Sequence, residues 1–208
     1  MILTKNPSMK QMLKELINIL VSKSLQVAPE PIFKLASGTK SNTYIDCKKT
    51  TLTAKGSYLI GTIFFDRISH LNVDAIGGLT LGADPIALAV SQISYNKNHP
   101  INAFIVRKEP KGHGLKQEIE GDVRQGDNVI IVDDVITTGG STIKAIQRAR
   151  EFGLNIIKVI VLVDRQEGGK ENILDQNVDL EAIMTKQDLL DEYYRRTKGI
   201  DKQGALSR

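Results

Sequence analysis

Residues 129–142 read VIIVDDVITTGGST, and this stretch decides how the chain folds. It begins with four branched aliphatic residues, a run that is typical of a strand buried on both faces. Asp133 and Asp134 end the run, and glycine and hydroxyl residues then lead into a helical pattern. Free backbone N–H groups and the positive end of a helix dipole converge at such a turn, which therefore suits an anion. An ordinary turn capped by Ser or Thr is the alternative, but it leaves the two carboxylates unexplained.

Strands and helices alternate along the rest of the chain. Short apolar runs predict further strands, at residues 73–78, 101–106, 156–163 and 180–184. Apolar residues at helical spacing predict helices, which follow the cap Ser8, cover 54–71, begin at Asp84, cover 141–152 and cover 186–196. The second helix has the expected buried stripe Tyr58, Leu59, Ile63, Phe64 and Ile68. This alternation predicts an α/β fold with a doubly wound, mainly parallel sheet flanked by helices.

Pairs of glycine or charged residues follow four of the predicted strands. They are Gly77 and Gly78, Arg107 and Lys108, Asp133 and Asp134, and Asp164 and Arg165. Ligands bind beyond the carboxyl ends of the strands in such sheets, so the four pairs predict one site. Residues 107–126 contain four glycines, many charges and little apolar content, which is typical of a functional lid.

The length of 208 residues favours one domain over residues 1–208. Within it we expect a small N-terminal hood at about 1–53, a core at about 54–196 and a frayed polar tail at 197–208. In the hood, residues 33–53 are expected to form two short extended segments joined by a turn at 37–40. Hydrophobic residues make up 41% of the chain, enough for a core, and no 18-residue apolar run predicts a membrane span.

Charge and residue usage narrow the expected partners. The net charge of +4 suits a small phosphorylated ligand, whereas aromatic residues are only 5%, so nucleic-acid binding is not expected. The single cysteine, Cys47, excludes an intrachain disulfide, fits the cytoplasm and is more typical of a packed or surface thiol than of a nucleophile. The Walker lysine and Rossmann glycine patterns are absent, so the turn beside two carboxylates favours a sugar phosphate over a nucleoside triphosphate.

Residues 129–142 resemble the signature of the type I phosphoribosyltransferases, which bind 5-phosphoribosyl 1-diphosphate. Other motifs resemble those of the orotate-specific members, namely YID at 44–46, GADPI at 82–86, RKEPKGHG at 107–114 and DRQEGG at 164–169. The resemblance covers about residues 33–169, most of the chain. It implies an enzyme that makes orotidine 5′-monophosphate and diphosphate from orotate and 5-phosphoribosyl 1-diphosphate, a step of pyrimidine (UMP) synthesis.

The same resemblance implies roles for individual residues. Residues 137–141 would cradle the 5-phosphate, and Asp133 and Asp134 would face the ribose hydroxyls and stabilise an oxocarbenium-like transition state. The residues implied to be catalytic are Lys111, His113, Asp133 and Asp134. Those implied to bind the sugar diphosphate are Arg107, Lys108, Lys111, His113, Asp133, Asp134, Val135, Ile136, Thr137, Thr138, Gly139, Gly140 and Ser141. Thr137 and Arg165 are implied to bind orotate, with a buried structural ion pair at the strand end as the alternative for Arg165.

The resemblance also implies a cofactor and a second subunit. Mg²⁺ would bridge the diphosphate and the ribose hydroxyls, held mainly by ligand and water oxygens rather than by a protein cage. Arg107, Lys108, Lys111 and His113 would neutralise the departing diphosphate. In the family this segment reaches the neighbouring subunit, which implies a homodimer with residues 107–114 acting in trans.

The chain departs from the family pattern at two places. Many members have a lysine where this chain has Ala36, and some have a lysine in the loop that here reads Leu79, Thr80 and Leu81. Two rival functions also stay open: a phosphoribosyltransferase for a purine base, and a regulator that binds the sugar phosphate or RNA without catalysis. The intact cationic segment argues against the regulator, because a sensor need not stabilise a leaving group.

Overall fold

The computed structural model describes residues 7–34, 38, 40–109 and 118–204, with side chains as far as residue 198. Its centre is a six-stranded sheet with the order β10-β9-β8-β5-β6-β7. The strands are β5 (Ala75–Leu79), β6 (Asn102–Val106), β7 (Ile119–Glu120), β8 (Asn128–Ile136), β9 (Asn155–Asp164) and β10 (Leu180–Thr185). All neighbouring pairs are parallel except β6 and β7, which confirms the predicted mainly parallel sheet.

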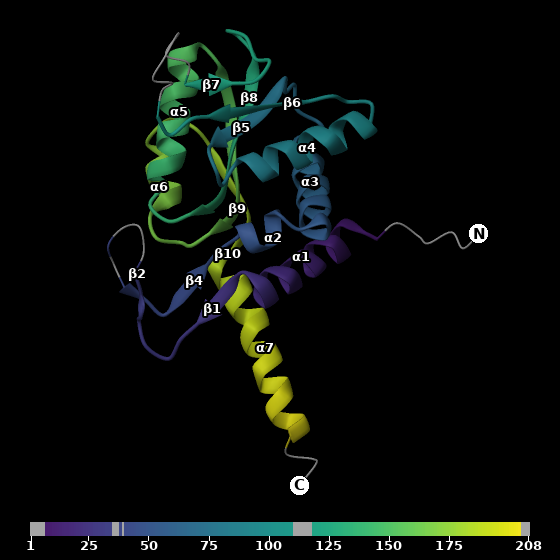
Figure 1. Ribbon diagram of the computed structural model, residues 1–208, viewed down its shortest axis with the longest axis vertical. Coiled ribbons are helices and arrows are strands. Elements are labelled where there is room, and N and C mark those ends of the chain that lie inside the picture. Colours follow the sequence, from purple (N-terminus) through teal and green to yellow (C-terminus); the bar gives the residue numbers. More distant parts are fainter. Residues whose placement is uncertain (1–6, 35–37, 39, 110–117, 205–208) are drawn as a thin grey trace, which may run out of the picture.

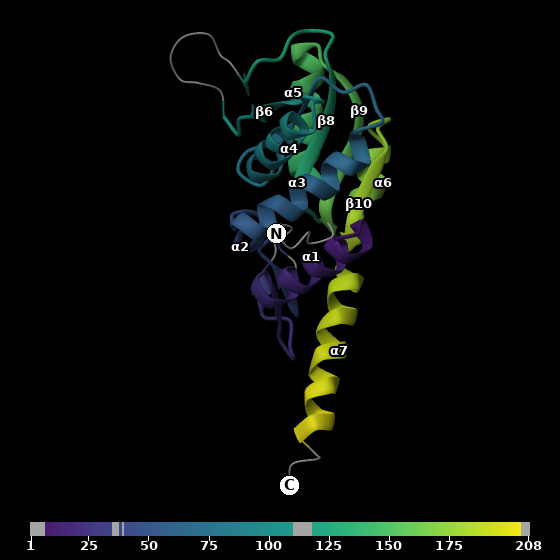
Figure 2. The same cartoon turned by 90° about the vertical axis from the view of Figure 1, so that its right-hand side faces the viewer.

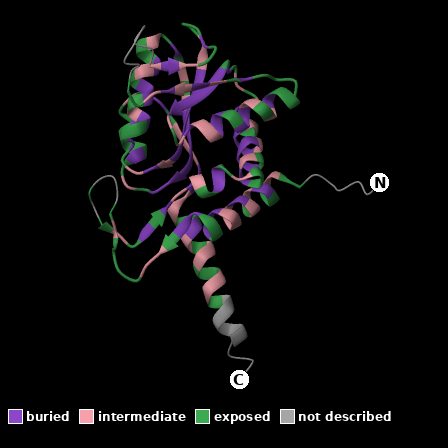
Figure 3. Cartoon of the chain, in the orientation of Figure 1, coloured by how far each residue is buried: buried purple, intermediate pink, exposed green. Residues whose placement is uncertain are grey.

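Helices cover both faces of this sheet (Figure 1). One face carries α1 (Met9–Lys23), α3 (Ala54–Ile68) and α4 (Asp84–Asn96), and the other carries α5 (Gly140–Phe152) and α6 (Gly169–Leu174). Along β8 the buried side chains alternate between the two layers. Ile130 and Val132 pack with the first group of helices, whereas Val129 and Ile131 pack with α5 and α6. The continuous aliphatic run at 129–132 therefore reflects two cores that share one strand, and Figure 3 shows the sheet as the most buried layer.

The sheet divides between β5 and β8. Strand β5 pairs with β6 along its whole length, but it pairs with β8 only from Ala75 to Gly77. Strand β8 continues beside β9 as far as the Ile136–Asp164 pair. Helix α4 follows β5 on one face, and α5 follows β8 on the other. Ligands of doubly wound sheets bind at this kind of switch point. The connections after the two strands lead to opposite faces of the sheet and leave a crevice between them.

The N-terminal hood consists of short elements beside the sheet. Strands β1 (Leu25–Val27) and β4 (Thr43–Ile45) form one antiparallel pair, and β2 (Phe33–Lys34) and β3 (Lys40–Ser41) form another. The second pair confirms the two extended segments expected around the 37–40 turn. Strand β1 and helix α2 (Lys48–Thr51) were not predicted, because elements of three or four residues carry too little periodic signal.

Several boundaries differ from the predictions. Strand β8 continues through Asp133 and Asp134 to Ile136 rather than ending at the carboxylates. Tyr58 is 52% exposed and does not belong to the buried stripe of α3, whereas Leu59, Ile63, Phe64 and Ile68 are buried as expected. The 107–126 connection contains β7. Helix α6 was also missed, because it has only six residues.

Helix α7 (Lys186–Gly204) begins at the predicted cap, where the Asp188 backbone N–H donates to Thr185 Oγ1 at 3.2 Å. It runs past the predicted end at Arg196, so residues 197–204 are helical rather than a frayed tail. In both views its second half extends away from the body of the molecule (Figures 1 and 2). None of the described helices is long and apolar enough to cross a membrane.

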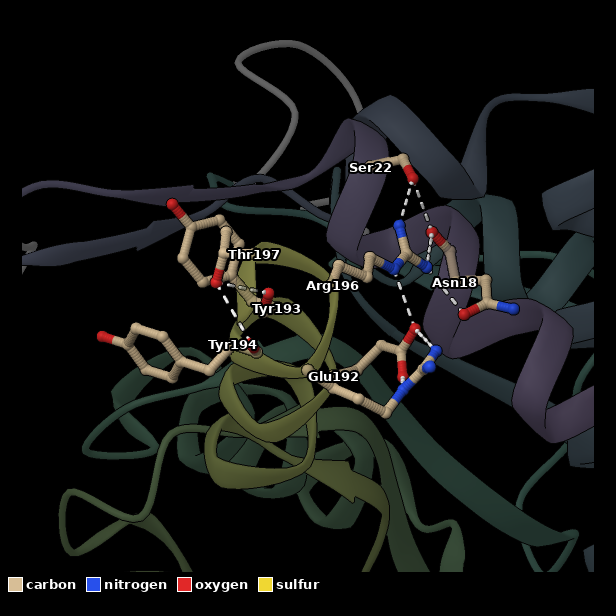
Figure 4. A network of polar contacts seen from close by, with 8 residues as sticks. Asn18, Ser22, Glu192, Tyr193, Tyr194, Arg196 and Thr197 are labelled. Carbon is tan, nitrogen blue, oxygen red and sulfur yellow. Dashed lines mark hydrogen bonds and ion pairs between the residues drawn. The ribbon is translucent and has the colours of Figure 1, made fainter. Parts of the chain in front are cut away.

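Arg196 fastens α7 to α1 (Figure 4). Its guanidinium donates to Asn18 Oδ1 at 2.6 Å, to the Asn18 carbonyl at 3.2 Å and to Ser22 Oγ at 2.8 Å. It also pairs with Glu192 at 2.8 Å. Arg195 pairs with Glu192 as well, at 2.7 Å, but in the described part of the chain its hydrogen bonds stay within α7. The two neighbouring arginines therefore differ in whether they join two helices.

We expect Arg196→Ala to lower the free energy of unfolding by about 1–3 kcal/mol, because it leaves acceptors on α1 without their donor. Arg195→Ala removes the same charge and is the matched control, which should leave the thermal midpoint nearly unchanged because an exposed ion pair is worth little. Chemical denaturation of the two variants checks this. Equal losses would show that the contacts to α1 contribute nothing.

Candidate active site

A cavity of about 610 Å³ opens at the switch point. It collects residues from α2, the loop after β5, the end of β6, strand β8 and the first turn of α5. The lining residues are Lys48, Leu79, Thr80, Leu81, Gly82, Lys108, Asp133, Asp134, Val135, Thr137, Thr138, Gly139, Gly140 and Ser141. Of the four predicted pairs, the two aspartates and Lys108 line this cavity. Gly77, Gly78, Asp164 and Arg165 are not among its described lining residues, and the loop after Gly78 takes part instead.

Asp133 and Asp134 are each only 5% exposed, although both are charged residues within a strand. Asp133 Oδ2 accepts hydrogen bonds from Ser141 Oγ at 2.8 Å and Thr142 Oγ1 at 3.0 Å. Asp133 Oδ1 accepts one from the Asp134 backbone N–H at 3.0 Å. Asp134 Oδ2 is buried and accepts no hydrogen bond. Three hydrogen bonds thus hold Asp133, whereas Asp134 Oδ2 is a buried acceptor without a hydrogen bond.

This environment changes the protonation of the pair. Burial first, and then the neighbouring Asp134 charge, raise the pKa of the Asp133 carboxyl to about 6. The hydroxyls of Ser141 and Thr142 limit that rise, because they donate to the charged form. Burial also raises the pKa of Asp134, and the positive charge of Lys48 partly offsets the effect. Two adjacent buried carboxylates with raised pKa values are typical of a functional site.

Lys48 is the cation that the sequence reasoning missed. Its Nζ lies 3.8 Å from Asp134 Oδ2, which is an ion pair beyond hydrogen-bond reach, and 3.2 Å from Asp46 Oδ1. The signal was its position two residues after the YID motif, since Asp46 of that motif holds it in place. Cys47 beside it is fully buried, as a packed thiol would be, and burial raises the pKa of its thiol well above the usual value.

The first turn of α5 forms an anion cradle. Gly139 precedes the helix in the left-handed conformation, with φ of 86°, and no side-chain hydrogen bond caps the helix at that position. A residue with a Cβ is strained at such a φ, which explains the glycine. Thr137, Thr138, Gly140 and Ser141 line the cavity around this turn. Uncapped N–H groups at the positive end of a 13-residue helix attract a phosphate.

The loop after β5 packs closely against the carboxylates. A Cβ on Gly82 would lie 2.5 Å from Asp134 Oδ1 and 3.0 Å from Asp133 Oδ1, so only glycine fits there. Thr80 Oγ1 donates to Asp84 Oδ2 at 2.7 Å, which ties the loop to the first turn of α4. Because position 82 has no side chain, the loop can approach the two carboxylates closely. The loop, the carboxylates and the first turn of α5 therefore line one cavity.

The two predicted cations at the end of β6 separate in the structure. Lys108 lines the cavity, whereas Arg107 pairs with Glu120 of β7 at 3.3 Å and is not among the described lining residues. Ile136, a further predicted contact, directs its side chain into the core shared with α5 and α6. The predicted catalytic residues Lys111 and His113 lie outside the described residues, as does Ala36.

Arg165 lies apart from these lining residues. It is 3% exposed, pairs with Glu167 Oε1 at 3.1 Å and reaches Ser41 Oγ at 3.4 Å and the Thr43 carbonyl at 3.5 Å. It therefore joins the end of β9 to the hood. Nearby in the hood, Phe33 stacks on Tyr44 with ring centroids 5.8 Å apart.

A switch-point sheet with an uncapped helix N-terminus and a buried carboxylate pair in one cavity is an arrangement that suits a sugar phosphate. The chain belongs to the phosphoribosyl transferase family, because the profile of the phosphoribosyl transferase domain matches residues 59–184. This confirms the family expected from residues 129–142. The orotate phosphoribosyltransferase of Aquifex aeolicus (strain VF5) is 46% identical over 177 residues, which are 85% of this chain and 97% of that relative.

Solved structures agree with this assignment. A structure of Mycobacterium tuberculosis H37Rv orotate phosphoribosyltransferase is 32% identical with a TM-score of 0.73, and covers 86% of this chain and 98% of that chain. Another structure of that enzyme, in complex with 5-phospho-α-D-ribosyl 1-diphosphate, is 31% identical with a TM-score of 0.70 and the same two coverages, 86% and 98%. The resemblance of the fold therefore includes an enzyme solved with a sugar diphosphate.

The raised pKa of Asp133 predicts a pH-dependent stability. In the folded state the Asp133 carboxyl keeps its proton up to about pH 6, whereas in the unfolded state it loses the proton near pH 4. The free energy of unfolding therefore falls as the pH rises between these values. Asp133→Asn removes this cost. Its free energy of unfolding relative to the unmodified protein should therefore rise by about 2 kcal/mol from pH 4.5 to pH 7.5.

Urea denaturation at both pH values measures this difference. Asp66→Asn, which removes an exposed carboxyl on α3, is the control for the general loss of one negative charge. A relative stability of Asp133→Asn that is the same at both pH values would contradict the raised pKa.

Proposed function

We propose that this chain transfers the 5-phosphoribosyl group from 5-phosphoribosyl 1-diphosphate to orotate, giving orotidine 5′-monophosphate and diphosphate in pyrimidine (UMP) synthesis. The observation that carries the proposal is the pair of buried carboxylates beside an uncapped helix N-terminus in one cavity. Orotate phosphoribosyltransferases that are 41–46% identical over 75–85% of the chain support orotate as the acceptor.

The two halves of the cavity suit two parts of the donor. The first turn of α5 would bind the 5-phosphate, because its free N–H groups and dipole attract a doubly charged anion. Asp134 would accept hydrogen bonds from ribose hydroxyls, since its Oδ2 is the oxygen without a hydrogen bond. Asp133 is held by three donors and would act through its charge. Both roles favour the cationic ribose over the neutral one.

The reaction exchanges one bond at the ribose C1. The bond from C1 to the diphosphate oxygen breaks and its electron pair leaves with the diphosphate. A ring nitrogen of orotate forms the new bond to C1, and the proton of that nitrogen passes to water or to the diphosphate. Positive charge develops on the ribose, close to Asp133 and Asp134, and negative charge develops on the leaving group. Lys108 lines the cavity, and Lys111 and His113 follow it in the sequence, so we assign these cations to the departing diphosphate.

Mg²⁺ would fit this site as an ion that enters together with the sugar diphosphate. Carboxylate oxygens are ligands that Mg²⁺ prefers, and Asp134 Oδ2 offers one without a hydrogen bond. In the part of the chain that the structure describes, no group of three or more His, Cys, Asp or Glu side chains is arranged to hold a metal. The donor and water would therefore supply most of its ligands. When bound, Mg²⁺ neutralises charge on the diphosphate.

Arg165 and Thr137 are the proposed contacts to orotate. The planar guanidinium of Arg165 presents paired donors that suit a carboxylate or ring carbonyls. Glu167 and the hood acceptors orient this guanidinium. Thr137 lines the cavity between the carboxylates and the cradle, so it borders both substrates in this assignment.

We further propose a cytoplasmic homodimer in which residues 107–114 act on the partner's site. Several of the exposed large apolar side chains lie on α3, α4 and the loop between β5 and α4, namely Tyr58, Leu81, Leu88 and Tyr95. Such side chains favour self-association over full solvation. The single cysteine is buried, which suits a reducing compartment.

The decisive experiment offers orotate, adenine and hypoxanthine separately, with 5-phosphoribosyl 1-diphosphate, in the presence and absence of Mg²⁺. We expect orotidine 5′-monophosphate from orotate, little or no product from the purines, and loss of turnover when EDTA removes the metal. Turnover of a purine but not of orotate would show that the acceptor is a purine base and would overturn the proposed specificity. Tight binding of the sugar diphosphate without turnover of any base would favour the regulator.

Lys111→Ala and His113→Ala should each lower kcat about 10²-fold or more, because each removes a cation that would stabilise the leaving group. The thermal midpoint should stay within about 2 °C, because the charged, glycine-containing sequence of this segment predicts an exposed connection. Steady-state kinetics and differential scanning calorimetry check both statements. An equal loss of stability would make these residues structural.

The trans arrangement is tested by mixing two inactive variants. Lys111→Ala supplies an intact carboxylate pair, and Asp134→Asn supplies an intact cationic segment. Mixed dimers should regain activity, because one of their two sites contains both intact parts. Verified mixed dimers that stay inactive would refute action in trans.

A further inference from the structure

Arg148 of α5 binds the chain on both sides of residues 110–117. Its guanidinium donates to the backbone carbonyls of Arg107 and, at 3.2 Å, of Lys108. Its Nε also pairs with Glu118 Oε1 at 3.4 Å. The side chain is 18% exposed, so these contacts are partly shielded from water. One planar group thus contacts Arg107, Lys108 and Glu118, which lie before and after residues 110–117 in the sequence.

Residues 105–108 and 118–120 form the stem of the cationic segment, and few backbone hydrogen bonds hold its two sides together. The Arg107 N–H donates to the Glu118 carbonyl at 2.8 Å, and β6 and β7 pair over only two residues on each strand. The side-chain pair of Arg107 and Glu120 is half-exposed and adds little. Arg148 adds charge-assisted hydrogen bonds to two carbonyl oxygens that lie beyond the end of β6. Its removal therefore takes away these polar contacts between the stem and α5, whereas Val106 and Ile119 still pack in one core with that helix.

That helix is also the one that carries the anion cradle. Arg148 lies eight residues after Gly140, about 12 Å along α5. Lys108, whose carbonyl Arg148 binds, lines the same cavity as Gly140 and Ser141. A rigid helix therefore joins the group that would bind the 5-phosphate to the residue that begins the cationic segment.

We propose that Arg148 is a positioning residue for the transfer reaction, which fixes Lys108 and the stem of the cationic segment relative to the cradle. This inference rests on the proposed function. Arg148 contacts backbone atoms and Glu118 rather than the cavity, so it acts through the placement of other cations. Its role is to keep the distance between the two anion sites constant while the diphosphate departs.

The kinetic test compares Arg148→Ala with Arg150→Ala. Arg150 lies on the same helix and also donates to a backbone carbonyl, that of Gln176 at 2.7 Å, but not to the stem. Arg148→Ala should lower kcat/KM for the sugar diphosphate about 10- to 100-fold, because a small misplacement of a charged group is costly in the transition state. The KM for orotate should change less than about twofold, and Arg150→Ala should leave both constants near those of the unmodified enzyme.

Arg148→Lys separates geometry from charge. A lysine keeps the charge, but its single nitrogen cannot serve two carbonyls and Glu118 with the fork geometry of a guanidinium. We therefore expect it to recover only part of the lost kcat/KM. Full recovery by lysine would show that charge alone matters and would overturn the positioning role. Parallel losses in kcat/KM for both substrates and in thermal midpoint would also overturn it.

Amide hydrogen exchange gives a readout that does not require turnover. The Arg107 N–H, which donates to Glu118, should exchange about tenfold faster in Arg148→Ala, while core amides of β8 such as that of Ile131 stay unchanged. If the unmodified protein does not turn over orotate, the proposed function fails, yet faster exchange at Arg107 still supports the assignment of Arg148 to the stem. Unchanged exchange at Arg107, or unchanged kcat/KM in an active enzyme, overturns the proposal.

Discussion

The structure depends on the burial of two adjacent carboxylates inside a strand. Neighbouring residues of a strand point to opposite faces of the sheet, so Asp133 and Asp134 meet different layers of the protein. Asp133 receives the hydroxyls of Ser141 and Thr142 from α5, and Asp134 faces Lys48 of α2. Buried charges are stable only when donors or opposite charges surround them. The site therefore requires helices on both faces, and it requires β5 to separate from β8.

The remaining parts of the site follow from that separation. The gap beyond Gly77 admits the loop at 79–82, and Gly82 permits it to approach the carboxylates without a clash. The gap also exposes the first turn of α5, whose N–H groups lack a side-chain cap. Negative carboxylates and a positive helix end then border one cavity. Such an arrangement suits a ligand with a phosphate at one end and a developing cation at its centre.

Helix α5 combines these tasks. Its first turn borders the cavity, its hydroxyls hold Asp133, and its second half carries Arg148 to the stem between β6 and β7. A helix is stiff over such a length, so contacts made at its two ends are mechanically related. The geometry of the anion sites is thereby set by one element rather than by a flexible connection.

Much of the fold could be predicted because local signals agreed with the tertiary structure. The aliphatic run at 129–132, the helix cap Ser8 and the helix at 141–152 were predicted correctly. Each rests on backbone geometry that a few neighbouring residues decide. The prediction for Tyr58 was wrong. Its helical spacing places it in the predicted buried stripe of α3, but its side chain is exposed. Periodicity defines a face, but the neighbouring elements decide how far that face is covered.

The sequence by itself determined the order of the longer strands and helices, the acidic pair and the glycine turn before α5, because these follow from residue type and spacing. It did not separate Lys108 from Arg107, or identify Lys48, because which cation enters a cavity depends on partners distant in sequence. Glu120 draws Arg107 away from the cavity, and Asp46 and Asp134 draw Lys48 into it. Electrostatic pairing between segments that meet only after folding decided the composition of the site.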